Sequence, residues 1–319
     1  MKYLKKILPA VLTVALTALM LCLVSILTSP KNNTQDAGHD AWAAYGFEAE
    51  PENTIDMFML GDSESRTSIS PMELFHNEGI TSYCCGVNAC RLCEVYEMLQ
   101  LVLETQSPDL LIIESNVIFS PFNWKDALES ITSSIFPVIH WHNRWKTLTK
   151  EDFTTIPAYT SVEVRKGYYH AALYNSAPPY LLDRYMTPTD EKEPLADINH
   201  YYIGKIAKTC KKKGIQLIIM SMPSVKNWNT QKHNTCVDLS EELEVPFIDL
   251  NEMREEVPID WSVDTRDEGD HLNNAGMEKV CSWLGPYLRE TWGLEDHRGD
   301  PAYDESWTDL YEAYVERIS

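Results

Sequence analysis

The sequence predicts an α/β fold of three layers, in which helices cover both faces of a parallel sheet. Five short apolar runs are typical of buried strands, over residues 55–60, 82–87, 110–113, 215–220 and 245–250. Segments with apolar residues at helical spacing separate these runs. Because strands alternate with helices and the runs are continuously apolar, we expect parallel strands that are buried on both faces.

Capping residues set the bounds of the expected helices. Ser70 suits an N-cap and Pro71 suits the first helical position, which predicts a short helix from this point. Gly214 suits the end of a longer helix. The longer helices are expected over residues 89–105, 195–213, 231–244 and 274–291.

The N-terminus predicts a transmembrane anchor. Lys2, Lys5 and Lys6 precede an uncharged apolar run, Ile7–Thr28, which has about the 20 residues that span a bilayer as a helix. The lysines place the N-terminal side in the cytoplasm. The run is longer than a signal-peptide core, so residues 1–28 are expected to be an uncleaved signal anchor, with a cleaved and secreted form as the alternative. In either form the chain from about Ser29 lies outside the cytoplasm, at the cell surface.

The rest of the chain is expected to form one large domain. Of the 319 residues, 29–53 are expected to be a linker, and 54–292 an α/β domain with an insertion at about 117–195. Residues 293–319 form an acidic, aromatic tail whose apolar spacing predicts a docked helix at its end. The net charge of −21 argues against nucleic-acid binding, because a phosphate backbone requires Lys and Arg.

Neither a cofactor nor a metal site is expected. His140 and His142 alternate, which would place both imidazoles on one face of a strand, but no further ligands complete a zinc site. Seven cysteines lie outside the anchor, mostly in apolar stretches, so buried thiols are expected. A single disulfide within residues 84–93 is the alternative.

Two motifs at opposite ends of the domain carry the candidate chemistry. Gly61-Asp62-Ser63 follows the first strand, where a serine would lie at the ligand-binding edge of a parallel sheet. A serine needs a base to become a nucleophile, and His271 lies among carboxylates before the last long helix. Together, Gly61-Asp62-Ser63 and the late Asp270-His271-Leu272-Asn273 resemble the SGNH (GDSL-type) hydrolase superfamily. The resemblance implies a three-layer, flavodoxin-like fold with Ser63 as nucleophile and His271 as general base.

The acid that orients His271 is less clear, because the superfamily places an Asp three residues before the His. That position holds Glu268 here. A one-residue bulge would let Asp267 reach the imidazole, and Asp267 is therefore favoured over Asp270 and Glu268. A Ser-His dyad is also allowed. For the oxyanion, the resemblance implies backbone N–H groups of Ser63 and Gly86 and the side chain of Asn116.

Cationic and aromatic residues suggest where a substrate binds. Arg66 follows the serine turn and would face an anionic group, while Trp141, Arg144 and Trp145 would line a sugar or anionic acceptor cleft.

Further motifs narrow the resemblance to membrane-anchored bacterial proteins of the DltD, AlgX and AlgJ type. These motifs include His-Asn-Arg-Trp-Lys and the later residues Pro223, Ser224, Trp228, His233 and Asn234. Such relatives often work beside a membrane-bound O-acyltransferase. The resemblance therefore implies an esterase or O-acyltransferase that acts on a glycan or polyol through an acyl-serine, with a non-catalytic scaffold as the alternative.

Overall fold

The computed structural model describes residues 4–318, so Lys2 and Ser319 lie outside the described residues. The chain divides into two compact units. The first comprises the chain up to Asp40 together with Asn123–Ser161, and the second comprises Ala41–Phe122 and Val162–Ser319. Each unit is described separately.

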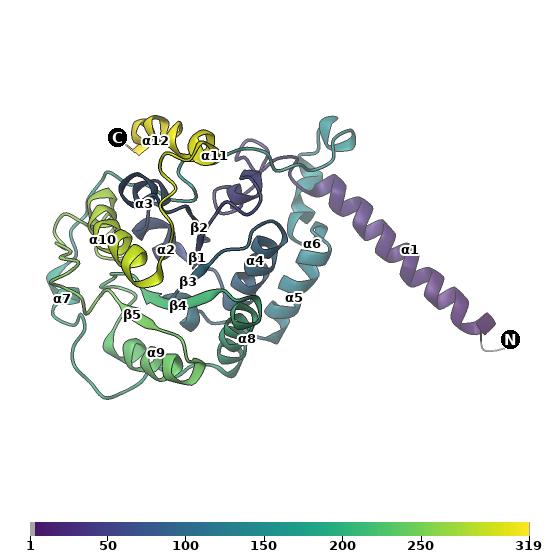
Figure 1. Ribbon diagram of the computed structural model, residues 1–319. Coiled ribbons are helices and arrows are strands. Elements are labelled where there is room, and N and C mark those ends of the chain that lie inside the picture. Colours follow the sequence, from purple (N-terminus) through teal and green to yellow (C-terminus); the bar gives the residue numbers. More distant parts are fainter. Residues whose placement is uncertain (1–3, 319) are drawn as a thin grey trace. The chain divides into compact units, whose positions relative to one another are not determined.

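The second unit is built on a sheet of five parallel strands in the order β2-β1-β3-β4-β5. This architecture confirms the predicted α/β class, and every predicted apolar run contains a strand. Figure 1 shows the strands side by side. Their bounds are β1 Met57–Gly61, β2 Ser82–Gly86, β3 Leu110–Glu114, β4 Gln216–Ser221 and β5 Phe247–Asp249.

The strand order creates a switch point at β1. The chain moves from β1 to β2 on one side, and then returns past β1 to β3 on the other. Gly61 at the end of β1 pairs with Gly86 at the end of β2, and Leu60 pairs with Ile113 of β3. Ligands of open α/β sheets bind at such a point, beyond the carboxyl ends of the strands. The segment after Gly61 therefore begins at the favoured position for a site.

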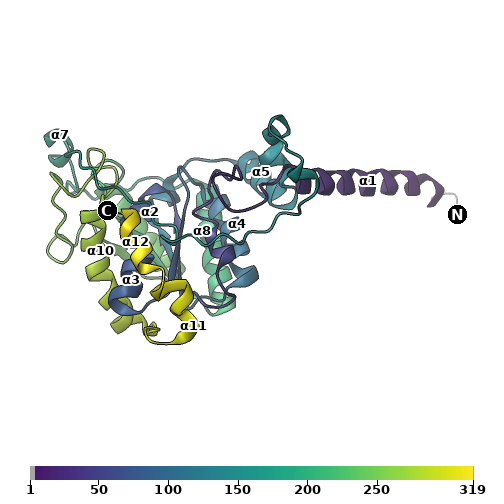
Figure 2. The same cartoon turned by 90° about the horizontal axis from the view of Figure 1, so that it is seen from above.

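Helices cover both faces of the sheet, with α3 and α10 on one face and α4 and α8 on the other (Figure 2). Ser70 caps α3 by accepting a hydrogen bond from the Glu73 amide, with Pro71 at the first position, as predicted. The helices of this unit are α2 Ser63–Ser68, α3 Pro71–Glu78, α4 Leu92–Thr105, α7 Pro179–Leu182, α8 Asp197–Lys213, α9 Thr230–Leu243, α10 Asn274–Tyr287, α11 Pro301–Tyr303 and α12 Tyr311–Ile318. Shorter turns are η1 Gly46–Ala49, η2 Ser115–Phe119, η5 Leu288–Trp292 and η6 Asp304–Thr308.

The acidic tail completes the core on the α3 and α10 face. Trp307 and Tyr314 are fully buried. The Trp307 ring stacks on Phe75 with centroids 5.1 Å apart, and the Tyr314 hydroxyl lies 2.8 Å from the hydroxyl of Ser70. The tail thus contributes apolar area to the same core as α3.

Residues 41–53 do not form the free linker expected from their composition. Phe47 is fully buried and packs edge-on against Phe58 and Tyr83, with centroid distances of 5.5 and 5.9 Å. The Tyr83 hydroxyl donates to the Ala43 carbonyl over 2.9 Å. Burial of the Phe47 ring, together with this hydrogen bond, fixes the segment to the domain.

The cysteines are free thiols, as expected from their apolar surroundings. All of them except Cys22 are buried, and none of those in the Cys84 to Cys93 cluster forms a disulfide. Burial raises the pKa of the Cys84 thiol to about 11, which keeps it protonated and unreactive at neutral pH.

The first unit contains the N-terminal helix α1, Leu4–Thr28. Its segment Ile7–Thr28 has 22 residues with a mean hydropathy of 2.6, which is long and apolar enough to cross a membrane. Such a helix serves either as an anchor or as a signal sequence. The unit's other helical segments are α5 Trp124–Ile135, α6 Val138–Trp141, η3 His142–Lys146 and η4 Glu151–Phe153.

Residues 138–146 are helical, so the expectation of a strand with both imidazoles on one face is wrong. Nε2 of His140 lies 3.4 Å from Oδ2 of Asp40, whereas Nδ1 of His142 lies 2.8 Å from the Ile139 carbonyl oxygen. The two imidazoles therefore have different partners. The segment follows Pro137, which suits the start of a helix because its φ is already fixed in the helical range.

Replacing the buried tail indole tests this packing. Trp307→Ala removes a fully buried ring and should lower the free energy of unfolding by about 3–5 kcal/mol. Trp145→Ala is the control, because that side chain is 66% exposed and its loss should change stability by less than about 0.5 kcal/mol. Thermal unfolding of the full chain in detergent measures both. Equal effects would show that the tail does not belong to the core.

Candidate active site

Ser63 occupies the first position of α2, immediately beyond β1. Asp62 is the N-cap, and its carboxylate accepts a hydrogen bond from the Glu64 amide at 3.1 Å. Ser63 is half-buried, while Asp62 and Glu64 are buried. The Ser63 hydroxyl makes no hydrogen bond to any residue within the described range 4–318. The turn therefore presents this hydroxyl unpaired at the switch point of the sheet.

His271 is held by Asp267. Nδ1 of the imidazole lies 2.7 Å from Oδ2 of Asp267, and the His271 amide donates to Oδ1 of the same carboxylate over 2.7 Å. The imidazole side chain is 12% exposed. Burial opposes ionisation of Asp267, but its hydrogen bonds with the His271 ring and amide bring its pKa below the ordinary value. An ionised Asp267 at neutral pH fixes the ring and directs Nε2 away from it.

The backbone between these two residues contains the bulge that the sequence required. Glu268 and Gly269 both have positive φ, at 66° and 88°. A Cβ on Gly269 would lie 2.0 Å from Cγ2 of Val225, so this position also has no room for a side chain. Two successive left-handed residues turn the chain enough for Asp267, four residues before His271, to reach its ring.

Asp270 has a different partner. Its Oδ1 lies 3.6 Å from Nδ1 of His271, beyond hydrogen-bonding distance, and accepts instead from Nδ2 of Asn227 at 2.5 Å. The same Asn227 nitrogen also donates to Oε1 of Glu64 at 2.5 Å. Asn227 therefore connects the residue after Ser63 with the residue before His271, which brings the two predicted catalytic turns together.

Ser63 and His271 are not hydrogen-bonded to each other. Nε2 of His271 is buried and has no hydrogen-bond partner among the described residues. A buried polar nitrogen without a partner is costly in a folded protein and is common at sites that await a ligand or a proton. Catalytic hydrogen bonds of unliganded enzymes are often long, and they shorten when substrate binds.

The three expected oxyanion donors differ in availability. The Ser63 amide, at the start of α2, donates to no group within residues 4–318. The side-chain amide of Asn116 is already engaged, because Nδ2 donates to Oδ2 of Asp62 over 3.0 Å and Oδ1 accepts from Lys232 over 2.8 Å. Gly86 permits close contact with α2, since a Cβ there would lie 2.4 Å from the hydroxyl oxygen of Ser65.

A buried group of acids lies behind the serine turn. Oxygens of Asp62, Glu64 and Glu114 all lie within 4.8 Å of one another. Burial, and then the neighbouring carboxylates, raise the pKa of Glu64 and of Glu114 well above the ordinary value for glutamate. Both glutamates are therefore protonated at neutral pH and hydrogen-bond to Asp62.

Two sets of residues have the donor atoms of a metal site, but protein groups already occupy them. The first is the acid group just described, whose Glu114 accepts from the amides of Asn116 and Val117 at 2.6 and 3.2 Å. The second is Asp267, Asp270 and His271. Here Nδ1 of His271 is already hydrogen-bonded to the carboxylate of Asp267.

The predicted substrate-binding residues fall in different units. Arg66 lies on α2 beside Ser63, but Trp141, Arg144 and Trp145 belong to the first unit with α1. The Arg144 guanidinium donates to the Thr28 carbonyl over 2.8 Å and to Asp152 over 3.2 Å. These bonds give Arg144 a structural role within its own unit.

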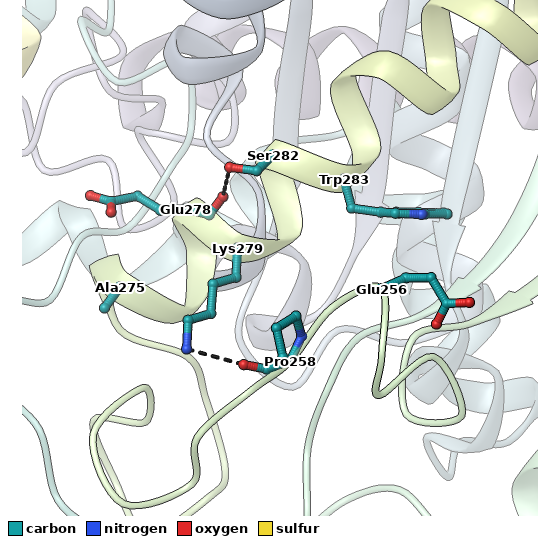
Figure 3. A pocket seen from close by; sticks show the side chains of 7 residues that line it. All are labelled: Glu256, Pro258, Ala275, Glu278, Lys279, Ser282 and Trp283. Carbon is teal, nitrogen blue, oxygen red and sulfur yellow. Dashed lines mark hydrogen bonds between the residues drawn. The ribbon is translucent and has the colours of Figure 1, made fainter.

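An open hollow of about 530 Å³ lies beside α10 and contains none of the predicted site residues (Figure 3). The lysine that lines it, Lys279, already has partners, because its ammonium group donates to the Pro258 carbonyl over 3.0 Å and to Asp264 over 2.6 Å. The Ser282 hydroxyl donates to the Glu278 carbonyl over 2.7 Å. The residues that line the hollow are Glu256, Pro258, Ala275, Glu278, Lys279, Ser282 and Trp283.

Sequence reasoning missed the polar residues that support the site. Asn227 and Lys232 come from the loop after β4 and from α9, while Glu114 ends β3. Lys232 donates to the Asn227 carbonyl over 2.6 Å as well as to Asn116. Each of these residues follows or ends a strand of the parallel sheet. That position at the carboxyl edge could have marked them as site residues from the sequence alone.

No protein-family profile and no curated protein matches this chain. Solved structures that resemble it are GDSL-type acylhydrolases and esterases. A lipase/acylhydrolase from Enterococcus faecalis is 10% identical, with a TM-score of 0.40, over 76% of this chain and 98% of that one. A GDSL-like lipase from Bacteroides thetaiotaomicron is 11% identical, with a TM-score of 0.38, over 78% and 98%.

An acetyl xylan esterase from the rumen bacterium Butyrivibrio proteoclasticus is also 11% identical, with a TM-score of 0.35, over 76% of this chain and 65% of that one. Because these TM-scores are below 0.5, the function proposed below depends on the residues of this chain.

Stability should report the protonated state of Glu64. A glutamate whose folded pKa is raised holds its proton after the unfolded chain has released it, at about pH 4.3. Stability should therefore fall as the pH rises from about 4.3 towards the folded pKa, by up to about 1.4 kcal/mol per pH unit for this group. Glu64→Gln mimics the protonated acid, so the variant should gain stability relative to the wild type with rising pH.

Unfolding measured at several pH values tests this, with the exposed Glu241→Gln as the control. If Glu64→Gln and Glu241→Gln follow the same pH profile, Glu64 is ionised in the folded protein and its assignment is wrong.

Proposed function

We propose that this protein is an extracytoplasmic serine acyl enzyme, an esterase or O-acyltransferase of the SGNH type. Ser63 is the nucleophile, His271 the general base and Asp267 the orienting acid. The enzyme acts on ester-bearing glycans or polyols at the cell surface. Its chemistry requires no cofactor, because a protein side chain carries the acyl group.

The arrangement around His271 supports this proposal most strongly. One ring nitrogen is hydrogen-bonded to the half-buried carboxylate of Asp267, while the other is buried and unpaired among the described residues. Asn227 links this turn to the serine turn. An imidazole with Nδ1 protonated toward Asp267 has a free lone pair on Nε2, which is the form a general base requires. A surface histidine with only a structural role would not need a buried, unpaired nitrogen.

The reaction proceeds in two halves. Nε2 of His271 removes the Ser63 proton as Oγ attacks the acyl carbonyl, and the resulting imidazolium gives that proton to the departing alcohol oxygen. This leaves the acyl group on Ser63. In the second half, His271 removes a proton from water or from a sugar hydroxyl, whose oxygen attacks the acyl-serine, and the proton returns to Ser63. The Ser63 amide is the available backbone donor for the oxyanion.

Location and partner belong to the same proposal. The apolar helix α1 would hold the protein at the membrane with its second unit outside the cytoplasm, in the orientation that the N-terminal lysines favour. A membrane-bound O-acyltransferase is then the partner that supplies acyl groups, as in proteins of the DltD, AlgX and AlgJ type, which the sequence resembles.

A non-catalytic scaffold is the second candidate. Two observations favour it: Ser63 and His271 are not hydrogen-bonded, and Asn116 is engaged by Asp62 and Lys232 rather than open to an oxyanion. A scaffold would keep the fold and its hydrogen-bond network but would not acylate Ser63.

Hydrolysis of p-nitrophenyl acetate by the full chain in detergent tests the catalytic assignment. Ser63→Ala and His271→Ala should each reduce the rate by about 10³-fold or more, because nucleophile and base act as one unit. Asp267→Asn should also lose about 10²-fold or more, since it disturbs the Nδ1 partner. Asp270→Asn should lose less, because Asp270 contacts Asn227 rather than the ring. Activity that survives in Ser63→Ala would exclude Ser63 as the nucleophile.

The product distribution separates transfer from hydrolysis. With p-nitrophenyl acetate as donor and a glycan oligosaccharide as acceptor, a transferase should yield acetylated oligosaccharide while the total release of p-nitrophenol changes little. Mass spectrometry of the oligosaccharide measures the transfer, and Ser63→Ala is the blank. Release of p-nitrophenol with no acetylated sugar at any acceptor concentration would identify an esterase.

A further inference from the structure

Two arginines stack on one tyrosine beside the candidate active site. Cζ of Arg66 lies 4.4 Å from the centroid of the Tyr169 ring, and Cζ of Arg266 lies 4.8 Å from it. The backbone joins the same elements, because the Tyr169 amide donates to the Arg66 carbonyl over 2.7 Å. Tyr169 is 43% exposed, so the group is open to solvent. A tyrosine ring can hold a guanidinium by its face and leave the N–H donors in the guanidinium plane free.

These donors have few partners within the protein. The Arg66 guanidinium makes no hydrogen bond or ion pair with any residue in the described range 4–318. Among the residues that the structure describes, Arg266 reaches a carboxylate only through Nε, which lies 3.4 Å from Oδ2 of Asp267. Burial lowers the pKa of Arg66 from its ordinary value, and the neighbouring cations Arg266 and Arg165 add to this shift. The chain has 48 acidic and 27 basic residues, so acidic partners are plentiful, and an arginine without one of them is unusual.

The position of the pair relates it to the proposed chemistry. Arg66 is three residues after Ser63 on α2, so the two side chains lie on neighbouring positions of one helix face. Arg266 directly precedes Asp267, the partner of His271. Tyr169 therefore holds one cation from the serine helix and one from the histidine turn at the same place.

We propose that Arg66 and Arg266 form a subsite for an anionic oxygen group, a carboxylate or a phosphate, on the molecule that reacts at Ser63. Each guanidinium presents its N–H groups as a planar fork that fits such groups in a bidentate manner. This inference rests on the proposed function, and it specifies the substrate as an anionic ester or an anionic glycan. The anion lies either on the acyl donor or on the acceptor.

The kinetic test uses matched substrates. The rates of wild type, Arg66→Gln and Arg254→Gln are measured with two acyl donors. The donor p-nitrophenyl hydrogen succinate carries an anionic group, whereas p-nitrophenyl acetate does not, so this pair tests for an anion on the donor. Glucose 6-phosphate and glucose as acceptors test an anion on the acceptor. Arg254 is the matched control, because its Cζ also lies over a tyrosine ring, 5.2 Å from the centroid of Tyr185, and its Nε donates to the Asn251 carbonyl over 3.4 Å.

In Arg66→Gln, the preference in kcat/KM for the anionic member of one pair should fall by about tenfold or more, mainly through KM. Arg254→Gln should keep the wild-type preference. The pair that shows the effect identifies which reactant carries the anion. No anionic preference in the wild type, or an equal preference in Arg66→Gln, would overturn the inference.

A binding measurement separates this inference from the proposed catalysis. Calorimetric titration of glucose 6-phosphate and of succinate into Ser63→Ala should show binding of one of them, and the Ser63→Ala/Arg66→Gln double variant should lose it. If the wild type shows no esterase activity but binding to Ser63→Ala is lost on adding Arg66→Gln, the anion subsite stands and the enzyme is rejected. Binding that is absent from Ser63→Ala, or is unchanged by Arg66→Gln, would reject the subsite even if hydrolysis is observed.

Discussion

The hydrogen bonds of Glu64 join the parts of the second unit that form the candidate site. This buried side chain follows Ser63, hydrogen-bonds to Asp62 at the end of β1, and accepts from Asn227 in the loop after β4. Asn227 in turn reaches Asp270, next to His271. Because parallel strands end at one edge of the sheet, residues 64, 227 and 270 converge there although they are distant in sequence. Loss of this link would separate the serine turn from the histidine turn without changing either catalytic side chain.

Burial of several acids at this edge is tolerable only if most of them are neutral. Glu64 and Glu114 carry raised pKa values, so their protons serve as hydrogen-bond donors to Asp62 instead of adding two buried negative charges. Lys232 supplies the nearby positive charge, and it contacts Asn116 and the Asn227 carbonyl. Burial lowers the pKa of Lys232 from its ordinary value. The site therefore rests on a nearly neutral polar network, in which each group fixes the orientation of its neighbours.

The fold and the positions of the serine and histidine turns could be predicted because they depend on local patterns. Continuous apolar runs mark parallel strands, Ser70-Pro71 marks a helix start, and the Asp267 alternative follows from counting residues back from His271. The supporting residues could not be found in this way. Asn227 and Lys232 act through contacts that depend on how β4 and α9 lie beside β1 and β3, and no local pattern encodes that arrangement. Residues 41–53 were misjudged for a related reason, because the contacts of Phe47 with Phe58 and of Ala43 with Tyr83 join segments that no local pattern connects.

The negative charge of the whole chain does not prevent a local preference for anions. At physiological ionic strength, exposed charges interact over only about 8 Å, so the net charge of −21 acts weakly on a ligand that has already reached the surface. Within contact distance, the two guanidiniums on Tyr169 supply positive charge, and the carboxylate of Asp267 meets only Nε of Arg266 among their donors. The acidic surface then slows the approach of anionic polymers in general, while the arginine pair favours those whose charge is placed to reach it. Such an arrangement selects by geometry rather than by overall charge.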